Sequence, residues 1–239
     1  MSRNVVRFVA IGVLLAGGGL AFRANRAQAA SDTASLVTKV LAAAGAEAAL
    51  PAATPALPAP ETAVFAGGCF WGVQAVFQHT KGVITARSGY SGGDRSTAMY
   101  EVVGTGRTGH AEAVRVVFDP SVVSYQTLMN IFFTVAHDPT QVNMQGPDHG
   151  PQYRSAIFTN SAEQLKATQA YISNLSNAKV YNKPIATEVS ALSGFYEAEK
   201  YHQDYATLHP NDMYIVINDA PKVENLRKQF PSLYRPTIK

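Results

Sequence analysis

The sequence is poor in cysteine and in charge. Cys69 is the single cysteine among 239 residues, which excludes an intramolecular disulfide framework and a thiolate-rich zinc site. Charged residues make up 15% of the chain and aromatic residues 10%, a composition that excludes a largely disordered protein. The six histidines show no HExxH-type spacing, so we expect no metal site.

Positive charge is concentrated at the start of the chain. Residues 1–29 hold four arginines and no acidic residue. Without these four, the 20 basic residues fall to 16 against 17 acidic ones, and the net charge changes from +3 to −1. The rest of the chain therefore has no bulk electrostatic attraction for nucleic acid.

The same 29 residues have the pattern of an export signal. Two arginines precede the apolar stretch Phe8–Phe22, and Ala27-Gln28-Ala29 then offers a small-x-small site for signal peptidase. The apolar stretch is short for a transmembrane helix, which needs about 20 residues. We expect a signal peptide over 1–29 and a periplasmic or secreted protein. The alternative is an uncleaved membrane anchor, because two further arginines follow the apolar core.

Residues 30–60 are rich in alanine and proline. The four prolines between 51 and 60 prevent a continuous helix and favour an extended, semi-rigid spacer. We expect a flexible linker over 30–60, with a short helix near Ser35–Ala44, followed by one catalytic domain over 61–239.

Within that domain, predicted strands and helices alternate. The patterns predict strands at 62–66, 83–88, 111–118, 154–159, 185–190 and 214–217. They predict helices from Cys69, from Ser124 as N-cap, from the capping-box sequence at Ser161 to about Leu175, and over 196–208. Some strands alternate in polarity, so one sheet face is open or lightly covered, which favours a two-layer α+β fold with a mixed sheet and flanking helices.

Cys69 is the first candidate for chemistry. A lone cysteine is more often a small buried hydrophobe. Its predicted place at a helix N-terminus changes this interpretation, because the dipole and free N–H groups stabilise a thiolate and lower its pKa. Phe70 and Trp71 follow directly and offer two aromatic walls for a small apolar group such as a methyl.

Glu112 is the second candidate. In the strand 111–118, period-two geometry places it on one face with Val114, Val116 and Phe118. A carboxyl on an apolar face has its pKa raised by desolvation and can act as a general acid. The alternative is a solvated, inert carboxyl at the end of the strand.

A loop and a short helix hold the remaining candidates. Asp148, His149 and Tyr153 offer an acid, a base and a phenol within six residues, although turn chemistry alone also explains an Asp in such a loop. Tyr100 lies in a short predicted helix, where it is a further candidate or a core aromatic.

These residues occur in motifs that resemble a known family. The segment Phe65-Ala-Gly-Gly-Cys-Phe-Trp-Gly72 is similar to the signature of the A-type peptide methionine sulfoxide reductases. Further motifs follow in the family's order: Gly89-Tyr-Ser-Gly-Gly93, Thr108-Gly-His-Ala-Glu-Ala-Val114, His137-Asp-Pro139, Gln145-Gly and Gln152-Tyr-Arg-Ser155. The resemblance covers about 62–217 and implies the repair of methionine sulfoxide, which these enzymes reduce back to methionine.

The resemblance implies a ferredoxin-like single domain and a set of roles. Cys69 would attack the sulfoxide sulfur of the S epimer and become a sulfenic acid, while Glu112 would protonate the departing oxygen. The substrate-binding residues that it implies are Phe70, Trp71, Tyr100, Asp148 and Tyr153. No cofactor is implied beyond an external thiol reductant, and we expect a monomer whose partners are oxidised proteins or peptides.

Three departures from the family pattern matter, one of which is that Pro147 replaces the usual Asn before Asp148 and Ala98-Met99 the usual Pro-containing approach to Tyr100. Many relatives carry resolving cysteines near the C-terminus, but Met213–Lys239 contains none, so a thioredoxin-like or glutaredoxin-like protein or a small thiol must reduce the sulfenic acid. Gln74 stands where relatives often have Glu, and we assign it no acid role. Two other functions remain open from the residues: a cysteine hydrolase or acyltransferase using a histidine, and a non-catalytic module that binds methionine-containing peptides.

Overall fold

A six-stranded mixed sheet carries the site. The computed structural model describes residues 35–43 and 59–238, so the predicted signal peptide and most of the predicted linker lie outside the described residues. The strand order is β7-β6-β1-β3-β2-β8, with β6 and β7 parallel and the other pairs antiparallel. The strands are β1 (Glu61–Gly67), β2 (Val83–Ser91), β3 (Ala111–Phe118), β6 (Ser155–Thr159), β7 (Glu188–Ala191) and β8 (Phe195–Glu197).

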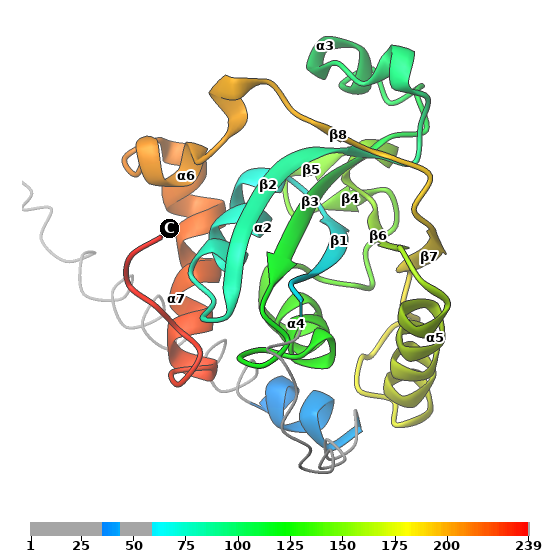
Figure 1. Ribbon diagram of the computed structural model, residues 1–239, viewed down its shortest axis with the longest axis vertical. Helices are drawn as coiled ribbons and strands as arrows, with labels where there is room; N and C mark the ends of the chain where they lie inside the picture. The colour runs from blue at the N-terminus through cyan, green and yellow to red at the C-terminus, as the bar shows by residue number, and fades with distance from the viewer. Residues whose placement is uncertain (1–34, 44–58, 239) are drawn as a thin grey trace, which may run out of the picture. The chain divides into compact units, whose positions relative to one another are not determined.

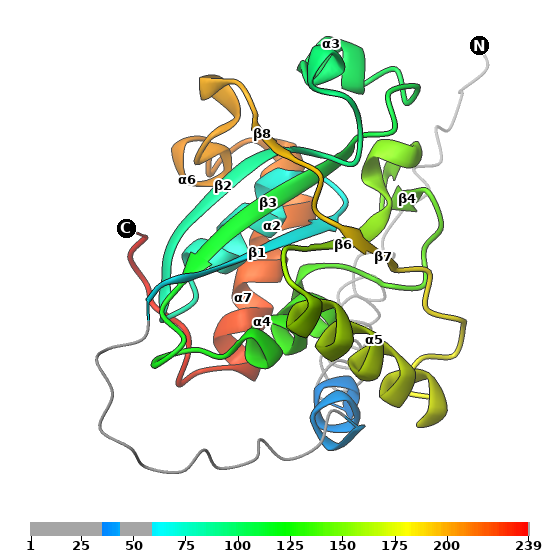
Figure 2. The ribbon, with the colours of Figure 1, turned by 45° about the vertical axis from the view of Figure 1, so that its right-hand side comes forward.

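Helices cover one face of this sheet more heavily than the other. Figures 1 and 2 show α2 on the face behind β2 and β3, α7 packed against α2, and α5 beside the β6–β7 edge. The longer helices are α2 (Phe70–Gln78), α4 (Tyr125–Ile131), α5 (Ala162–Asn177) and α7 (Ala220–Gln229). The short ones are α3 (Tyr100–Val103), α6 (Tyr205–Leu208) and the helical turns η1 (Arg95–Thr97), η2 (Phe132–Ala136), η3 (Pro151–Tyr153), η4 (Lys200–His202) and η5 (Ile215–Asp219).

The main hydrophobic core lies between the sheet and these helices. The ring of Phe65 from β1 stacks on Phe77 from α2 and on Phe132 from η2, with centroids 5.1 and 4.9 Å apart. A smaller cluster around Val64 and Phe158 occupies the opposite face. The two-layer α+β architecture with one lightly covered sheet face is therefore confirmed.

Several local predictions are confirmed by their capping contacts. Ser124 and Ser161 accept hydrogen bonds from the backbone N–H groups of Thr127 and Gln164, so they begin α4 and α5 as expected. A helix over 35–43 is present where one was expected, and its apolar side chains at 37 and 40 are buried. Within the described ranges, none of the helices is both long enough and apolar enough to span a bilayer.

The C-terminal third departs from the predicted elements. The single helix expected over 196–208 is wrong, because β8 pairs with β2 and Asp204 adopts a left-handed backbone (φ 59°) that interrupts helical geometry. The strand expected over 214–217 is also wrong, since this segment is the helical turn η5 that leads into α7. The turn expected at residues 89–93 begins later, because β2 continues through Ser91, and β7 begins at Glu188 rather than 185.

A pair of two-residue strands completes the site's surroundings. β4 (Met144–Gln145) and β5 (Asp148–His149) form a separate hairpin that precedes η3. This hairpin and η3 carry the loop residues that the sequence singled out, and η3 contacts β3.

Candidate active site

Cys69 is the N-cap residue of α2, directly after the glycine turn that ends β1. Gly68 has a φ of +88°, and an added Cβ there would lie 2.5 Å from Gln145 Cβ, so both conformation and space require glycine. The Cys69 side chain is buried. The strand-turn-helix arrangement predicted around this cysteine is confirmed.

Glu112 reaches the same helix end from the middle of the sheet. Its carboxyl Oε2 accepts a hydrogen bond from the backbone N–H of Phe70, the first residue of α2, at 3.0 Å. The side chain is 3% exposed, so the alternative of a solvated carboxyl is wrong. Burial raises the pKa of Glu112 to about 8, opposed by the Phe70 N–H and reinforced by the charge of Asp148. The predicted rise of this pKa is therefore confirmed.

The expected lowering of the Cys69 pKa is wrong. Burial raises the pKa of the Cys69 thiol well above its usual value, and the charges of Glu112 and Asp219 add to this effect. The Trp71 backbone N–H and the Lys222 ammonium act in the opposite direction. The helix N-terminus thus favours the thiolate, but desolvation by the surrounding protein outweighs it.

An aromatic wall stands beside Cys69. The Trp71 indole stacks on Tyr205 at 3.8 Å between centroids and meets Tyr214 edge-on at 5.9 Å. Its Nε1–H donates to Nδ1 of His202 at 3.2 Å, which leaves the other ring nitrogen of His202 as the proton-bearing one. Phe70 lies 5.1 Å from the same imidazole. The site therefore has an apolar surface of the kind predicted from Phe70 and Trp71.

Two phenols and the loop carboxyl complete the site. Burial raises the pKa of Tyr100 and of Tyr153, so both phenols keep their protons at neutral pH, and the carboxylate form of Glu112 adds to this effect. Asp148 accepts a hydrogen bond from the hydroxyl of Tyr214, and its charge acts on Glu112. The structure thus brings the candidates from α2, β3, α3 and the 148–153 loop to one end of α2.

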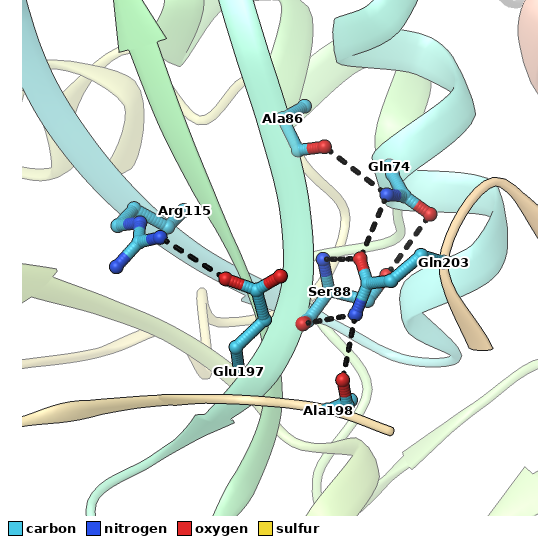
Figure 3. A network of polar contacts seen from close by, with 7 residues as sticks. All are labelled: Gln74, Ala86, Ser88, Arg115, Glu197, Ala198 and Gln203. Atoms are coloured by element: carbon cyan, nitrogen blue, oxygen red, sulfur yellow. Dashed lines mark hydrogen bonds and ion pairs between the residues drawn. The ribbon is translucent and has the colours of Figure 1, made fainter. Parts of the chain in front are cut away.

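Gln74 belongs to a structural network one turn further along α2. Figure 3 shows its amide nitrogen donating to the Ala86 carbonyl and to Gln203 Oε1, at 3.1 and 3.2 Å. Its amide oxygen accepts from Ser88 Oγ, and Gln203 Nε2 donates to the Ser88 and Ala198 carbonyls. These bonds fix the segment that carries residue 202 against α2 and β2, and they give Gln74 no acid role.

The histidines of the predicted motifs lie outside this constellation. Both ring nitrogens of His137 are engaged, with the Phe132 carbonyl at 2.9 Å and Ser155 Oγ at 2.7 Å, and burial lowers the pKa of His137 to about 4. His149 is exposed in β5. Within residues 35–43 and 59–238, no group of three or more histidine, cysteine or acidic side chains is placed to hold a metal ion.

The comparison with known families decides between the open interpretations. The family model described as "Peptide methionine sulfoxide reductase" matches residues 61–233. The chain belongs to this family. It is 58% identical over 179 residues to peptide methionine sulfoxide reductase MsrA 2 of Mesorhizobium japonicum, covering 75% of this chain and 92% of the relative. It is 49% identical over 176 residues to MsrA of a Thermus thermophilus strain, covering 74% and 98%.

Solved structures of the same family share the fold. Mxr1 of Saccharomyces cerevisiae in its reduced form superposes with a TM-score of 0.58 at 32% identity, over 64% of this chain and 87% of that one. Methionine sulfoxide reductase A of Corynebacterium diphtheriae gives 0.56 at 37% identity, over 64% and 76%. The curled mixed sheet with its helices is therefore the fold of the peptide methionine sulfoxide reductase family.

Sequence reasoning missed the C-terminal contributors to this family site. His202, Tyr205 and Tyr214 surround Trp71, whereas residues 219 and 222 act on the cysteine, and all lie in the last 40 residues of the chain. The sequence predicted one helix over 196–208 and one strand over 214–217, and neither element brings these aromatic residues to the same side of Trp71. The sequence signal that could have indicated them is the clustering of aromatic and charged residues between 200 and 222.

Proposed function

We propose that this chain reduces the S epimer of methionine sulfoxide, in proteins and as the free amino acid, with Cys69 as nucleophile and Glu112 as acid. The observation that carries the proposal is the buried Glu112 carboxyl beside the Cys69 end of α2, with its pKa raised to about 8. A sulfoxide oxygen leaves only when protonated, and a carboxyl that is neutral at pH 7 can supply that proton.

The chemical step moves two electrons from Cys69 to the substrate. The Cys69 thiolate attacks the sulfoxide sulfur, and Glu112 delivers its proton to the oxygen. The S–O bond of the substrate breaks, methionine leaves, and the oxygen ends on Cys69 as sulfenic acid. The sulfoxide sulfur is reduced, and the cysteine sulfur is oxidised by the same two electrons.

The remaining site residues bind the substrate. We assign the O–H groups of Tyr100 and Tyr153 to donate to the sulfoxide oxygen. The charges of the thiol and of the buried acid act on both phenols, which supports this assignment. Phe70 and Trp71 receive the methyl group on the aromatic wall. Asp148 belongs to the binding loop and accepts from the hydroxyl of the tyrosine at 214. Fixing both the methyl and the oxygen selects one epimer.

Recycling requires a thiol from outside the chain. Cys69 is the only cysteine, so two external thiol groups reduce its sulfenic acid, releasing water and forming a disulfide elsewhere. We propose a thioredoxin-like or glutaredoxin-like protein as the reductant. The export pattern of residues 1–29 supports a periplasmic or secreted location, with residues 30–60 as a linker and 61–239 as the catalytic domain.

The experiment measures methionine formed from each separate sulfoxide epimer by full-length protein with dithiothreitol. We expect turnover of the S epimer only. Cys69→Ser should abolish it, and Glu112→Gln should lower kcat by about 10² or more. Glu61→Gln, at the exposed start of β1, is the matched control and should leave kcat unchanged.

A single turnover without reductant identifies the intermediate. Mass spectrometry should find one added oxygen on Cys69 or, when dimedone is present, a thioether adduct in its place, together with one equivalent of methionine. Equal activity of Cys69→Ser and the unmodified chain would overturn the proposal.

A further inference from the structure

A buried ion pair lies against the first turn of α2. The Asp219 carboxyl, at the end of η5, accepts a hydrogen bond from Lys222 Nζ in α7 at 3.1 Å. Both groups pack onto Gly72, three residues after Cys69. An added Cβ at Gly72 would overlap Asp219 Oδ1 and lie 2.9 Å from Lys222 Nζ. The helix that carries the nucleophile therefore has glycine where the ion pair approaches it.

The carboxyl of this pair is incompletely satisfied. Asp219 is 0% exposed, and its Oδ2 has no hydrogen-bond partner among the described residues, whereas the Lys222 side chain is 19% exposed. Burying a charged carboxylate with one free oxygen costs free energy, and well-packed apolar residues of similar size often stabilise such a position better. Core packing alone therefore does not account for an acid at this position.

Several elements present titratable groups to the Cys69 thiol. Glu112 comes from β3 and Asp219 from η5, and both charges oppose ionisation of the thiol, whereas Lys222 from α7 favours it. The phenols that face the thiol belong to residues 100, 153 and 214. Glu112 is mostly neutral below pH 8, so its charge opposes ionisation of the thiol mainly at higher pH. Burial also raises the pKa of Asp219, and the Lys222 ammonium opposes that rise.

We propose that Asp219 and Lys222 form a positioning pair that sets the ionisation of Cys69, with Lys222 as the counter-ion of the thiolate and Asp219 as the group that opposes it. The inference rests on the proposed role of Cys69 as nucleophile. Desolvation keeps the thiol protonated, and the two charges act on it in opposite directions. Removing either partner unbalances them, and the direction depends on which charge is lost.

The test measures alkylation of Cys69 by iodoacetamide across a pH series in full-length protein without substrate. The single cysteine makes the signal specific. Lys222→Met removes the cation and should move the midpoint of the profile to higher pH. Asp219→Asn removes the anion and should move it to lower pH. Each change should alter the rate at pH 7 by about threefold, because a tenfold change in thiolate is partly offset by altered nucleophilicity.

The controls separate charge from folding. Lys228→Met, an exposed position in the same helix α7, should leave the midpoint unchanged, and Lys222→Arg, which keeps the cation, should preserve it. Thermal unfolding checks that each variant is folded. Should Lys222→Met fail to fold, Asp219→Asn and Lys222→Arg still decide the question. Unchanged midpoints, or a shift in the same direction for both partners, would overturn the proposal.

This outcome is distinct from a failure of the proposed function. Alkylation needs no sulfoxide and no reductant, so opposite shifts would support the pair even if the chain reduced neither epimer. Normal turnover with unchanged midpoints would remove the pair and leave the reductase intact. A second readout is peroxide inactivation, which should be faster in Asp219→Asn because oxidation follows thiolate content.

Discussion

Replacing Glu112 with glutamine should change stability and activity in opposite directions. The folded protein holds the Glu112 proton up to a pH of about 8, whereas an exposed glutamate loses it near 4.5. Between these values the folded state binds more protons than the unfolded state, so stability falls as the pH rises. Glutamine is isosteric, can still accept from the Phe70 N–H and has no proton to lose.

The magnitude follows from the width of this window. Each pH unit between the two pKa values costs the glutamate form about 1.4 kcal/mol relative to glutamine. Between about pH 5.5 and 7.5 the unfolding free energy of Glu112→Gln, relative to that of the unmodified protein, should therefore rise by about 2 to 3 kcal/mol. A constant penalty of about 1–3 kcal/mol for the new amide N–H groups is superimposed and does not depend on pH.

Urea unfolding of both proteins at several pH values measures the difference. Taking the difference removes every other titrating group, His137 included, because both proteins share them. Glu61→Gln controls for the loss of an exposed carboxyl. Parallel stability curves for Glu112→Gln and the unmodified protein would refute the raised pKa, and with it the neutral acid on which the proposed reaction depends.

Two further perturbations test the support of the site. The buried His137 has a pKa of about 4, against 6.5 for an exposed histidine. Its neutral form therefore contributes to the free energy of unfolding above pH 6.5, and about 3 kcal/mol of that contribution should be lost as the pH falls to 4. In urea unfolding, His137→Gln should flatten this pH dependence. Gly72→Ala should lower the unfolding free energy by about 1–3 kcal/mol through overlap with Asp219. Because alanine favours helix interiors by about 1 kcal/mol, a stabilised Gly72→Ala protein would contradict the close approach.

The central part of the site could be predicted because local patterns determine it. In the strand 111–118 the side chains that share a face with Glu112 are all buried. On the other face Ala111 and Ala113 are buried but Arg115 and Val117 are half-buried, so the period-two pattern placed Glu112 on the more apolar face. The two glycines before Cys69 and the apolar residues after it marked the turn and the helix. In each case neighbours in sequence determine the element and the face, whereas the contact between Glu112 and Phe70 joins β3 to α2 across 42 residues.

The C-terminal contributors could not be predicted in this way. Between residues 195 and 219 the chain passes through β8, η4, α6 and η5, and their positions depend on partners far away in sequence. Tyr196 pairs with Tyr90 of β2, and Asp204 donates its backbone N–H to Gln74 of α2. Local propensity favours one helix over 196–208, and tertiary hydrogen bonds override it.

The Cys69 pKa shows why position alone does not determine reactivity. A helix N-terminus stabilises an anion by about 0.3–1 kcal/mol, which lowers a pKa by less than one unit, whereas full burial can raise the pKa of an acid by several units. Cys69 is buried, so desolvation determines the direction of its pKa shift. The Cys69 pKa stays raised even with the Lys222 ammonium nearby, so a helix N-terminus is not by itself sufficient evidence of a thiolate.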